Sequence, residues 1–447
     1  MDTIFALASG TGTAGVAVYR VSGPASRAAL EALTGSEVPS PRQAVLRRVR
    51  DADGVEIDRG LVLWFPAPAS FTGEDVVEFH LHGGRAVRSA LYRALQALPE
   101  CRAAEAGEFT RRAFENGLLD LTQAEGLADL VAAETEGQRR QALRQMGGAL
   151  AAVYEGWRAE LVDCLALLES DIDFTDEDLP DNVSAPVFRR LADLAAAMRA
   201  HLADGHRGER LREGVRVAIV GPPNVGKSSL LNALARREVA IVTDIAGTTR
   251  DVLEVVLDLD GVPAVIADTA GVRRSGDAIE QEGVRRAMAR AASDDVRLLV
   301  LDSAALPVDA AAFGDLLQPP VIVAANKSDL AAVPDGYCFG GSAVVPVSVR
   351  SGVGIATLLE RLSGIVAEYA APAAEAGITR ERHRHAVSAA ADALDRAAGF
   401  AAGSGSVALE LVAEDVRLAT RSLGSITGRV DVEEVLGAIF SRFCIGK

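Results

Sequence analysis

Cysteine is scarce in this chain, and its few thiols lie far apart. The 447 residues include four cysteines, at positions 101, 164, 338 and 444, and no two of them form a CxxC pair. This spacing argues against a zinc site and against a disulfide framework. It is typical of a protein in a reducing compartment, so we expect a cytoplasmic location.

Long apolar runs and an excess of basic residues are also missing. No apolar stretch approaches the roughly 20 residues that a membrane-spanning helix needs, and the start, MDTIFALASG, lacks the features of a secretory signal. We therefore expect no membrane contact. The formal net charge of −16 argues against non-specific binding of nucleic acid. The basic run RERHRH at 380–385 is a candidate local patch, although such a run is more often a solvated helix face.

The length of the chain predicts several domains, because 447 residues are too many for one hydrophobic core. Residues 1–117 mix short strand-like runs with turns, which predicts an α+β domain. Residues 118–214 are helical in pattern, with one apolar stripe along a long helix from Leu143 to Ile172. Residues 215–370 alternate strand and helix patterns and predict a doubly wound α/β domain. The helical pattern returns over 371–447, so we expect the α/β domain to be inserted into a helical bundle domain.

The strongest motif lies in the α/β region. GPPNVGKS at 221–228 matches G-x-x-x-x-G-K-[ST] between a predicted strand and a predicted helix. The glycines let backbone N–H groups approach phosphates, Lys227 reaches the outer phosphates, and Ser228 can bind Mg²⁺. This pattern predicts a nucleotide-binding P-loop.

Three further motifs accompany the P-loop, and the last of them specifies the base. Thr249, in TDIAGTTRD, is a second candidate Mg²⁺ ligand; DTAG spans 268–271, and NKSD spans 326–329 after an apolar strand. Asp329 can accept hydrogen bonds from N1–H and the amino group of guanine, which adenine does not offer. A wrong base would leave buried groups unpaired. The ordered set predicts GTP binding and disfavours an ATP-driven motor or transport unit.

The predicted GTP-binding residues form five groups along the chain. Asn326 and Lys327 are expected to flank the base, and Ser348, in SVRSG, to lie in the last base-contacting loop. The full set is Asn224, Val225, Gly226, Lys227, Ser228, Ser229, Thr243, Asp244, Ile245, Ala246, Gly247, Thr248, Thr249, Asp268, Thr269, Ala270, Gly271, Asn326, Lys327, Ser328, Asp329, Ser348, Val349 and Arg350.

One position in these motifs lacks the expected chemistry. In many small GTPases a glutamine follows the DxxG turn and orients the attacking water. Val272 stands there in this chain, and its side chain has no hydrogen-bonding group. Glu280 and Glu282 are the nearby candidates to position the water. The residues alone do not separate them, and each is more often a solvated helix residue.

Motifs outside the α/β region resemble those of one family. These are FTGEDVVEFHLHGG (71–84), AGEFTRRAFENG (106–117), LDLTQAEGLADL (119–130) and the terminal CIGK (444–447). The chain resembles the tRNA-modification GTPases called MnmE or TrmE from residue 3 to its last residue. The resemblance implies an N-terminal folate-binding α+β domain that forms a homodimer, and a helical domain with an inserted G domain.

The resemblance also implies a function. Members of this family add an aminomethyl-type group to carbon 5 of the wobble uridine of tRNA. The one-carbon donor is 5-formyltetrahydrofolate or a related folate, and the partner is a FAD-dependent protein (MnmG or GidA) in a heterotetramer. The alternative is a regulatory GTPase switch that acts as a ribosome or RNP assembly factor. Such a switch has no need of the folate-type domain or of CIGK.

Proteins of the family use K⁺ where other GTPases use an arginine finger. By this resemblance the side-chain oxygen of Asn224 would bind K⁺, and carbonyls around Thr243, Ile245 and Thr248 would complete the site. A cation there neutralises charge that develops between the β- and γ-phosphates. Water positioning would then fall to Glu280, which we expect to be the catalytic residue.

The folate-binding residues are also implied by the resemblance. Arg20 and Glu78 would hold the ligand, with Lys447 contributing at the chain end. At Leu118 the family usually has lysine, in a stretch that resembles N-x-K-[LIM]-D-L. Loss of this cation would weaken binding of the glutamate tail unless an arginine at 111–112 compensates.

Overall fold

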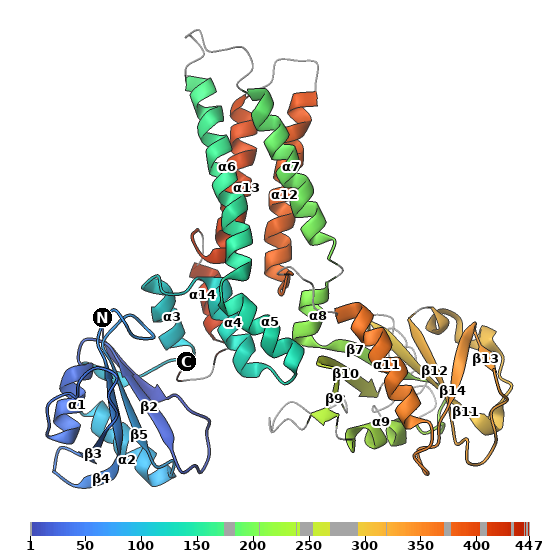
Figure 1. Cartoon of the computed structure of the whole chain (residues 1–447), viewed down its shortest axis with the longest axis horizontal. Coiled ribbons are helices and arrows are strands. Elements are labelled where there is room, and N and C mark those ends of the chain that lie inside the picture. The colour runs from blue at the N-terminus through green and yellow to red at the C-terminus, as the bar shows by residue number, and fades with distance from the viewer. Residues whose placement is uncertain are drawn as a thin grey trace, which may run out of the picture. The chain divides into compact units, whose positions relative to one another are not determined.

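The protein is described here from a computed structural model (Figure 1). It describes residues 2–173, 184–204, 206–237, 239–241, 254–268, 294–318, 320–370, 377–402, 409–430, 433–441, 443 and 446. Contacts divide the chain into two compact units. The N-terminal unit comprises residues 1–128, 151–158 and 423–447, and the second unit comprises 129–150 and 159–422.

The N-terminal unit contains a six-stranded sheet in the order β3-β4-β5-β2-β1-β6. All neighbours are antiparallel except β1 and β6. The strands are β1 (Thr3–Leu7), β2 (Ala17–Ser22), β3 (Val45–Arg50), β4 (Glu56–Phe65), β5 (Val76–Leu81) and β6 (Cys101–Ala103). Its helices include α1 (Ser26–Thr34), α2 (Arg85–Gln96), α3 (Glu108–Glu115) and α14 (Glu433–Phe440), and α4 (Leu121–Ala132) begins in it.

Alternation along β2 and β5 decides which side chains remain accessible. Successive residues of a strand point to opposite faces. Tyr19 and Phe79 therefore lie in the core with residues of α1 and α2, whereas Arg20 and Glu78 lie on the other face. Because Arg20 is paired with Glu78 in the strand register, their side chains are neighbours.

The second unit contains an eight-stranded sheet in the order β13-β14-β12-β11-β7-β10-β9-β8. The strands β10, β7, β11, β12 and β14 are parallel, and β8, β9 and β13 pair antiparallel at the edges. The strands are β7 (Val215–Val220), β8 (Ala240–Ile241), β9 (Glu254–Leu259), β10 (Val262–Asp268), β11 (Val296–Asp302), β12 (Val321–Asn326), β13 (Cys338–Phe339) and β14 (Ser342–Pro346). The helices of this domain include α9 (Lys227–Ala235) and α11 (Ile355–Ala370).

This sheet order positions the nucleotide motifs. Ligands of open α/β sheets bind beyond the carboxyl ends of the parallel strands, where the strand order reverses. The central strand β7 ends at the P-loop, and its neighbour β10 ends at Asp268. The next strands, β11 and β12, end at Asp302 and Asn326, which are paired in register.

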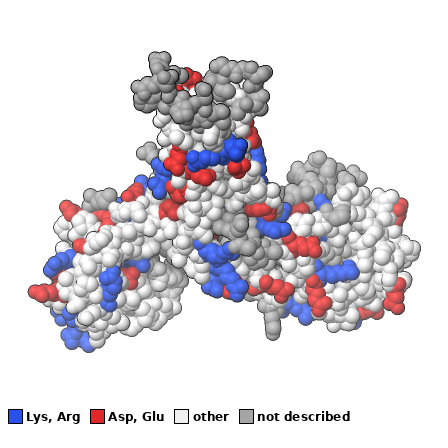
Figure 2. All heavy atoms as spheres, turned by 45° about the horizontal axis from the view of Figure 1, so that its top comes forward, with Lys and Arg blue, Asp and Glu red and all other residues white. Residues whose placement is uncertain are grey.

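Outside the two sheets the chain is mostly helical. Its four longest helices run alongside one another in Figure 1: α6 (Ala149–Asp173), α7 (Ser184–Leu202), α12 (Glu381–Ala402) and α13 (Leu409–Thr427). Ion pairs join them, including Arg199–Asp395 and Arg396–Asp415. Over this bundle, Figure 2 shows basic and acidic side chains next to one another. No helix among the described residues is long and apolar enough to cross a membrane.

Two sequence interpretations need correction. The predicted single helix along the stripe from Leu143 is two helices, because α5 (Glu136–Met146) ends before α6 begins. Gly147 and Gly148 separate them, and Gly148 has a φ of 84°, a left-handed conformation that glycine adopts at little cost. The apolar period continues across this break, so the period alone did not reveal it.

The basic run at 380–385 is a solvated face only in part: His385 is exposed beside Glu381, whereas other members of the run are held inward. Arg380 forms an ion pair of 2.7 Å with Asp129, and Arg384 pairs with Asp204 and Glu209 at 2.9 and 3.0 Å. His383 is fully buried. The run thus fixes the start of α12 within the second unit.

Candidate GTP-binding site

The P-loop is a tight turn between β7 and α9. A Cβ atom at Gly221 would lie 2.2 Å from the carbonyl oxygen of Val300, and one at Gly226 would lie 2.4 Å from Nδ2 of Asn326. Asn224, between them, has a φ of 62°. Such left-handed positions turn successive N–H groups toward one side, which forms an anion-binding concavity. Only glycine fits at the two close approaches.

Lys227 points into this loop. Its ammonium group donates hydrogen bonds to the carbonyl oxygens of Gly221 and Pro222 at 2.8 and 2.7 Å. Burial lowers the pKa of Lys227, and the charge of Asp268 opposes this effect. The ammonium is therefore already held among the backbone groups that surround phosphates in a P-loop.

Ser228 and Asp268 meet at the start of α9. The hydroxyl group of Ser228 donates to Oδ2 of Asp268, which is almost completely buried at the end of β10. A hydroxyl oxygen and a carboxylate oxygen side by side are the hard donors that Mg²⁺ prefers. The residues present thus fit a Mg²⁺ site.

Asn326 links the loops that surround the base. Its Nδ2 donates to the carbonyl oxygen of Val225 in the P-loop at 2.8 Å, and its Oδ1 accepts from the backbone N–H of Val349 at 3.3 Å. Asn326 is buried. It thereby ties the P-loop to the loop after β14.

Asp329, which is predicted to bind the guanine base, is oriented by a chain of hydrogen bonds. The hydroxyl group of Ser348 donates to Oδ1 of Asp329 at 2.7 Å, and the backbone N–H of Ser351 donates to Ser348 Oγ at 3.2 Å. Ser348 is fully buried. Its contact with the carboxylate is one that the sequence pattern did not predict.

Lys327 has a φ of 64° and turns away from the strand that it follows. Its ammonium group lies 2.6 Å from Oδ2 of Asp302, at the end of β11. This hydrogen bond holds the pKa of Asp302 below its ordinary value. Asp302 belongs to none of the sequence motifs, and its place at the end of a buried strand, paired with Asn326 of NKSD, is the feature that could have indicated it.

Some predicted residues lie outside the described residues. They are Thr243, Asp244, Ile245, Ala246, Gly247, Thr248, Thr249, Thr269, Ala270, Gly271, Glu280 and Lys447. Val272 and Glu282 lie outside them as well.

A second candidate site lies on the N-terminal unit. Nε and Nη2 of Arg20 donate to Oε1 of Glu78 at 3.1 and 2.9 Å, and Nε2 of His80 lies 3.2 Å from Oε2 of the same carboxylate. The guanidinium carbon of Arg20 lies 5.1 Å from the ring centre of Phe71 and 5.7 Å from that of Phe109. These are cation–π distances. Two rings and a carboxylate thus orient one partly exposed cation.

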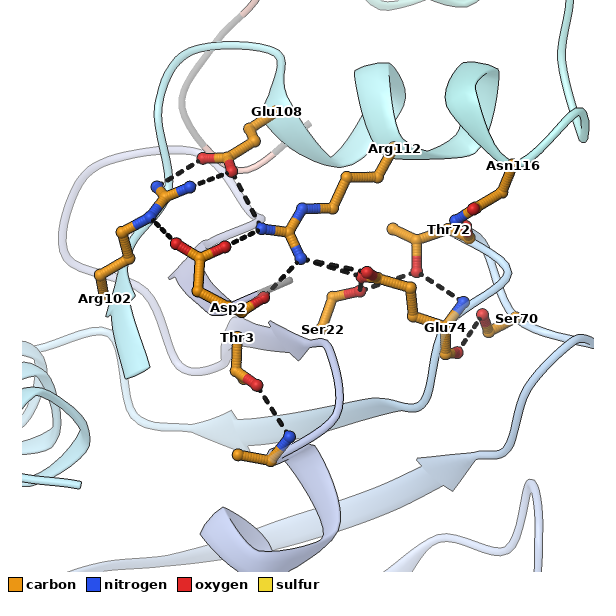
Figure 3. Close-up of polar contacts among 11 residues, drawn as sticks. Asp2, Thr3, Ser22, Ser70, Thr72, Glu74, Arg102, Glu108, Arg112 and Asn116 are labelled. Carbon is orange, nitrogen blue, oxygen red and sulfur yellow. Dashed lines mark hydrogen bonds and ion pairs between the residues drawn. The ribbon is translucent and has the colours of Figure 1, made fainter. Parts of the chain in front are cut away.

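A partly buried polar network fixes the loop that bears Phe71 (Figure 3). Asn116 donates to the carbonyl oxygen of Thr72 at 2.7 Å, and Ser70 donates to that of Glu74 at 2.6 Å. Ser22 donates to the carboxylate of Glu74 at 2.6 Å. The C-terminal cap of α3, strand β2 and the loop itself thereby hold the segment on both sides of Phe71.

Arg112 lies at the centre of this network. Only 7% of its side chain is exposed, and it pairs with Asp2, Glu74 and Glu108 at 2.8, 3.1 and 3.1 Å. Arg102 binds Asp2 and Glu108 as well (Figure 3). Arg112 is therefore committed to three carboxylates. It is not placed to compensate for the cation expected at position 118.

Leu118 itself lies at the surface, beside the loop that bears Phe71. Leu118 is 43% exposed, and its Cδ1 lies close to Gly73, in the loop that bears Phe71. Arg111 is exposed and forms an i,i+4 pair of 2.8 Å with Glu115. At the other end of the chain, a Cβ atom on Gly446 would lie 2.0 Å from the carbonyl oxygen of Leu7. Gly446 of CIGK thus lies against the end of β1, the strand that neighbours β2.

A P-loop at the switch point of a mostly parallel sheet, with NKSD at the end of β12, defines a P-loop GTPase. The family comparisons specify which one. The "GTP-binding protein TrmE N-terminus" family matches residues 3–118, and the "MnmE helical domain" family matches residues 121–444. The chain belongs to the MnmE (TrmE) family of tRNA modification GTPases.

Full-length relatives agree with this assignment. A protein of Parvibaculum lavamentivorans is 55% identical over 451 residues, and one of Paramagnetospirillum magneticum is 53% identical over 446; in both comparisons all of each chain is covered. Both are named tRNA modification GTPase MnmE. The G domain of the T. maritima FeoB iron transporter is 30% identical, with 35% of this chain and 98% of that chain covered at a TM-score of 0.27.

The predicted fold class is confirmed. An α+β N-terminal domain is followed by a helical domain, and a P-loop GTPase domain is inserted into the helical one. The family model of the helical domain extends on both sides of the sheet formed by β7 to β14.

Proposed function

We propose that this GTPase modifies carbon 5 of the wobble uridine of tRNA, adding an aminomethyl-type group. It acts in the cytoplasm as a homodimer, with a folate one-carbon donor and a FAD-dependent partner (MnmG or GidA) in a heterotetramer. The observation that carries the proposal is the oriented Arg20–Glu78 pair in the N-terminal unit. A ribosome or RNP assembly switch, the alternative, has no use for such a pair.

The folate site would use Arg20, Glu78, Leu118 and Lys447. A folate presents a pterin ring with hydrogen-bond donors and a tail of carboxylates. Glu78 is suited to accept from the pterin, and Arg20 offers a cation whose face is set by Phe71 and Phe109. Packing of Gly446 against Leu7 supports a contribution of the adjacent Lys447. The bound folate would supply the one-carbon unit.

The GTP site would use the P-loop amides, Lys227, Ser228 and the NKSD loop. The concavity at Asn224 receives the phosphates, and Lys227 moves from loop carbonyls to phosphate oxygens. Asp329, oriented by Ser348, accepts from the guanine edge. Ser228 and Thr249 would hold Mg²⁺, which when bound adds positive charge at the β- and γ-phosphates.

Hydrolysis would depend on the P-loop, on the segment around Thr249 and on the segment that follows DTAG. Asn224, at the exposed turn of the P-loop, offers a side-chain oxygen to K⁺, together with Thr243, Ile245 and Thr248. Glu280 would position the water that Val272 leaves without a partner. The domain limits 1–117, 118–214, 215–370 and 371–447 belong to the same proposal.

Mass spectrometry of tRNA nucleosides tests this function. Cells that lack the gene should lose the carbon-5 modification at the wobble position, and wild-type protein should restore it. Lys227→Ala should not restore it, because the phosphates lose their cation. Normal nucleosides with altered ribosomal subunit profiles would favour the assembly factor instead.

A further inference from the structure

Asp302 belongs to no nucleotide motif, yet it contacts the guanine-recognition loop directly. Its Oδ2 lies 2.6 Å from the ammonium group of Lys327, and its Oδ1 accepts from the backbone N–H of Ala304 at 3.0 Å. Both carboxylate oxygens are therefore used. The side chain is only 22% exposed, so water competes weakly for these contacts.

We propose that Asp302 is a positioning residue for guanine binding, which acts through Lys327. The ion pair fixes the ammonium end of a flexible lysine side chain. With that end fixed, the aliphatic part of Lys327 is held ready to contact the guanine ring. A preorganised side chain loses less conformational entropy when a ligand binds. Removal of the charge therefore weakens base binding without touching the phosphates or the reacting water.

Asp302→Asn tests this in the full-length protein, with Asp309→Asn as a matched control. Asp309 accepts from the backbone N–H of Ala311 at 2.9 Å, the same local cap with no lysine partner among the described residues. Asp302→Asn should raise the Kd of GDP and the KM of GTP by about fivefold, the size expected for a partly exposed charge-assisted hydrogen bond. The kcat should stay within twofold. Asp309→Asn should change neither value.

Two results would overturn the assignment. Wild-type nucleotide affinity in Asp302→Asn would show that Lys327 needs no anchor. A fall in kcat with unchanged affinity would place Asp302 in the hydrolytic step instead.

A separate observation concerns the hairpin formed by β9 and β10. Its tip touches the start of α5, because the backbone N–H of Gly137 donates to the carbonyl oxygen of Gly261 at 3.0 Å. A Cβ atom at Gly137 would lie only 2.4 Å from that oxygen. Asp260 at the same tip accepts from Ser363 of α11. We call the contact between Gly137 and Gly261 the glycine joint.

The start of α5 is itself firmly held. Thr135 and Gln138 form a reciprocal capping box at its first turn. Gln138 also donates through Nε2 to the carbonyl oxygen of Arg212 at 2.9 Å, at the end of α8 (Arg207–Glu213). Since α8 leads into β7, the first turn of α5 contacts the hairpin and the base of the P-loop strand together.

The other end of the hairpin lies in the nucleotide site. Strand β10 runs from the tip to Asp268, whose carboxylate accepts from Ser228. Backbone pairing with β7 and β9 along β10 makes this strand a stiff connection. In the sequence, the hairpin joins the segment that holds Thr249 to the DTAG motif at 268–271. GTPases use these two segments to sense the γ-phosphate.

We infer that the glycine joint transmits the nucleotide state from Asp268 to α5. A shift of β10 along its length moves the carbonyl group of Gly261, and the hydrogen bond to Gly137 then lengthens or shortens. Because Gly137 and Gly261 have no side chains, the two backbones contact each other directly, and a movement of one is passed to the other. The joint thus couples GTP hydrolysis to the helical part of the chain.

Hydrogen–deuterium exchange in the full-length protein tests this inference. The first turn of α5 should exchange at different rates with GDP and with the non-hydrolysable analogue GMPPNP. Gly137→Ala should remove the difference, because the added methyl group pushes the hairpin tip away. Gly156→Ala is the matched control, since a Cβ atom on this helical glycine meets nothing within 4 Å. It should keep the difference.

Equal exchange of α5 in both nucleotide states of the wild type would overturn the inference, whatever the variants do. A nucleotide-dependent difference that persists in Gly137→Ala would also overturn it. Thermal unfolding and GDP affinity, measured alongside, should stay near wild type in both variants.

Discussion

Replacement of Arg112 by methionine offers a direct measure of how the N-terminal unit is held together. The guanidinium group is buried among Asp2, Glu74 and Glu108. Methionine keeps much of the side-chain volume but removes the cation that pairs with Glu74, while Arg102 still pairs with Asp2 and Glu108. Breaking a buried ion pair by removal of one partner typically costs about 3–5 kcal/mol. Asp2 is 45% exposed and regains water, so we expect the lower end, about 3 kcal/mol.

The adjacent Arg111 provides the control. Its pair with Glu115 lies on the same helix but is half-exposed, so Arg111→Met should cost at most about 0.5 kcal/mol. Both tryptophans, Trp64 and Trp157, belong to the N-terminal unit. Urea unfolding of the full chain, followed by tryptophan fluorescence, therefore reports on this unit. Equal midpoints for the two variants would refute the role given to Arg112.

The same network predicts a pH dependence. A hydrogen bond from Arg102 holds the pKa of Asp2 below its ordinary value. Burial raises the pKa of Glu108, but hydrogen bonds from Arg102 and Arg112 outweigh burial and leave it lowered. Groups with lowered pKa stabilise the folded state above their unfolded pKa, and this contribution is lost as the pH falls through the folded pKa. Wild-type stability should decline below about pH 4, and Arg112→Met should show a shallower decline.

The remaining predictions concern the ligands. GTP turnover should be much faster in K⁺ than in Na⁺ at equal ionic strength, and Asn224→Ala should erase the difference; equal wild-type rates in both salts would remove the K⁺ assignment. Glu280→Ala should lower kcat by about a hundredfold with nearly unchanged GTP affinity, whereas Glu282→Ala should change little. Single-turnover hydrolysis in K⁺, with GTP affinity measured alongside, separates an effect on hydrolysis from one on binding. A loss of rate in Glu282→Ala but not in Glu280→Ala would contradict the assignment. Calorimetry should detect 5-formyltetrahydrofolate bound by the wild-type protein, and more tightly by Leu118→Lys; no wild-type binding would reject the folate site.

The sequence predicted those features that depend on local patterns. The P-loop, NKSD and the alternation that exposes Arg20 and Glu78 each follow from a short stretch of chain. The contacts that orient them do not. Ser348 reaches Asp329, and Asp302 reaches Lys327, only because separate strands end at the same edge of the sheet. Such contacts depend on strand order, which no single motif encodes.

Charge pairing on the N-terminal unit explains why Leu118 matters. A tail of carboxylates needs a cation that is not already paired. Arg112 is buried among three acidic groups, and withdrawing it would break a network that stabilises its own unit. Arg111 could exchange Glu115 for a ligand at little cost, because an exposed i,i+4 pair contributes only a few tenths of a kcal/mol. Under the proposed folate site, Arg111 is therefore the better candidate of the two arginines to supply the charge that Leu118 lacks. Arg111→Met, the stability control above, should thus weaken folate binding while leaving unfolding unchanged.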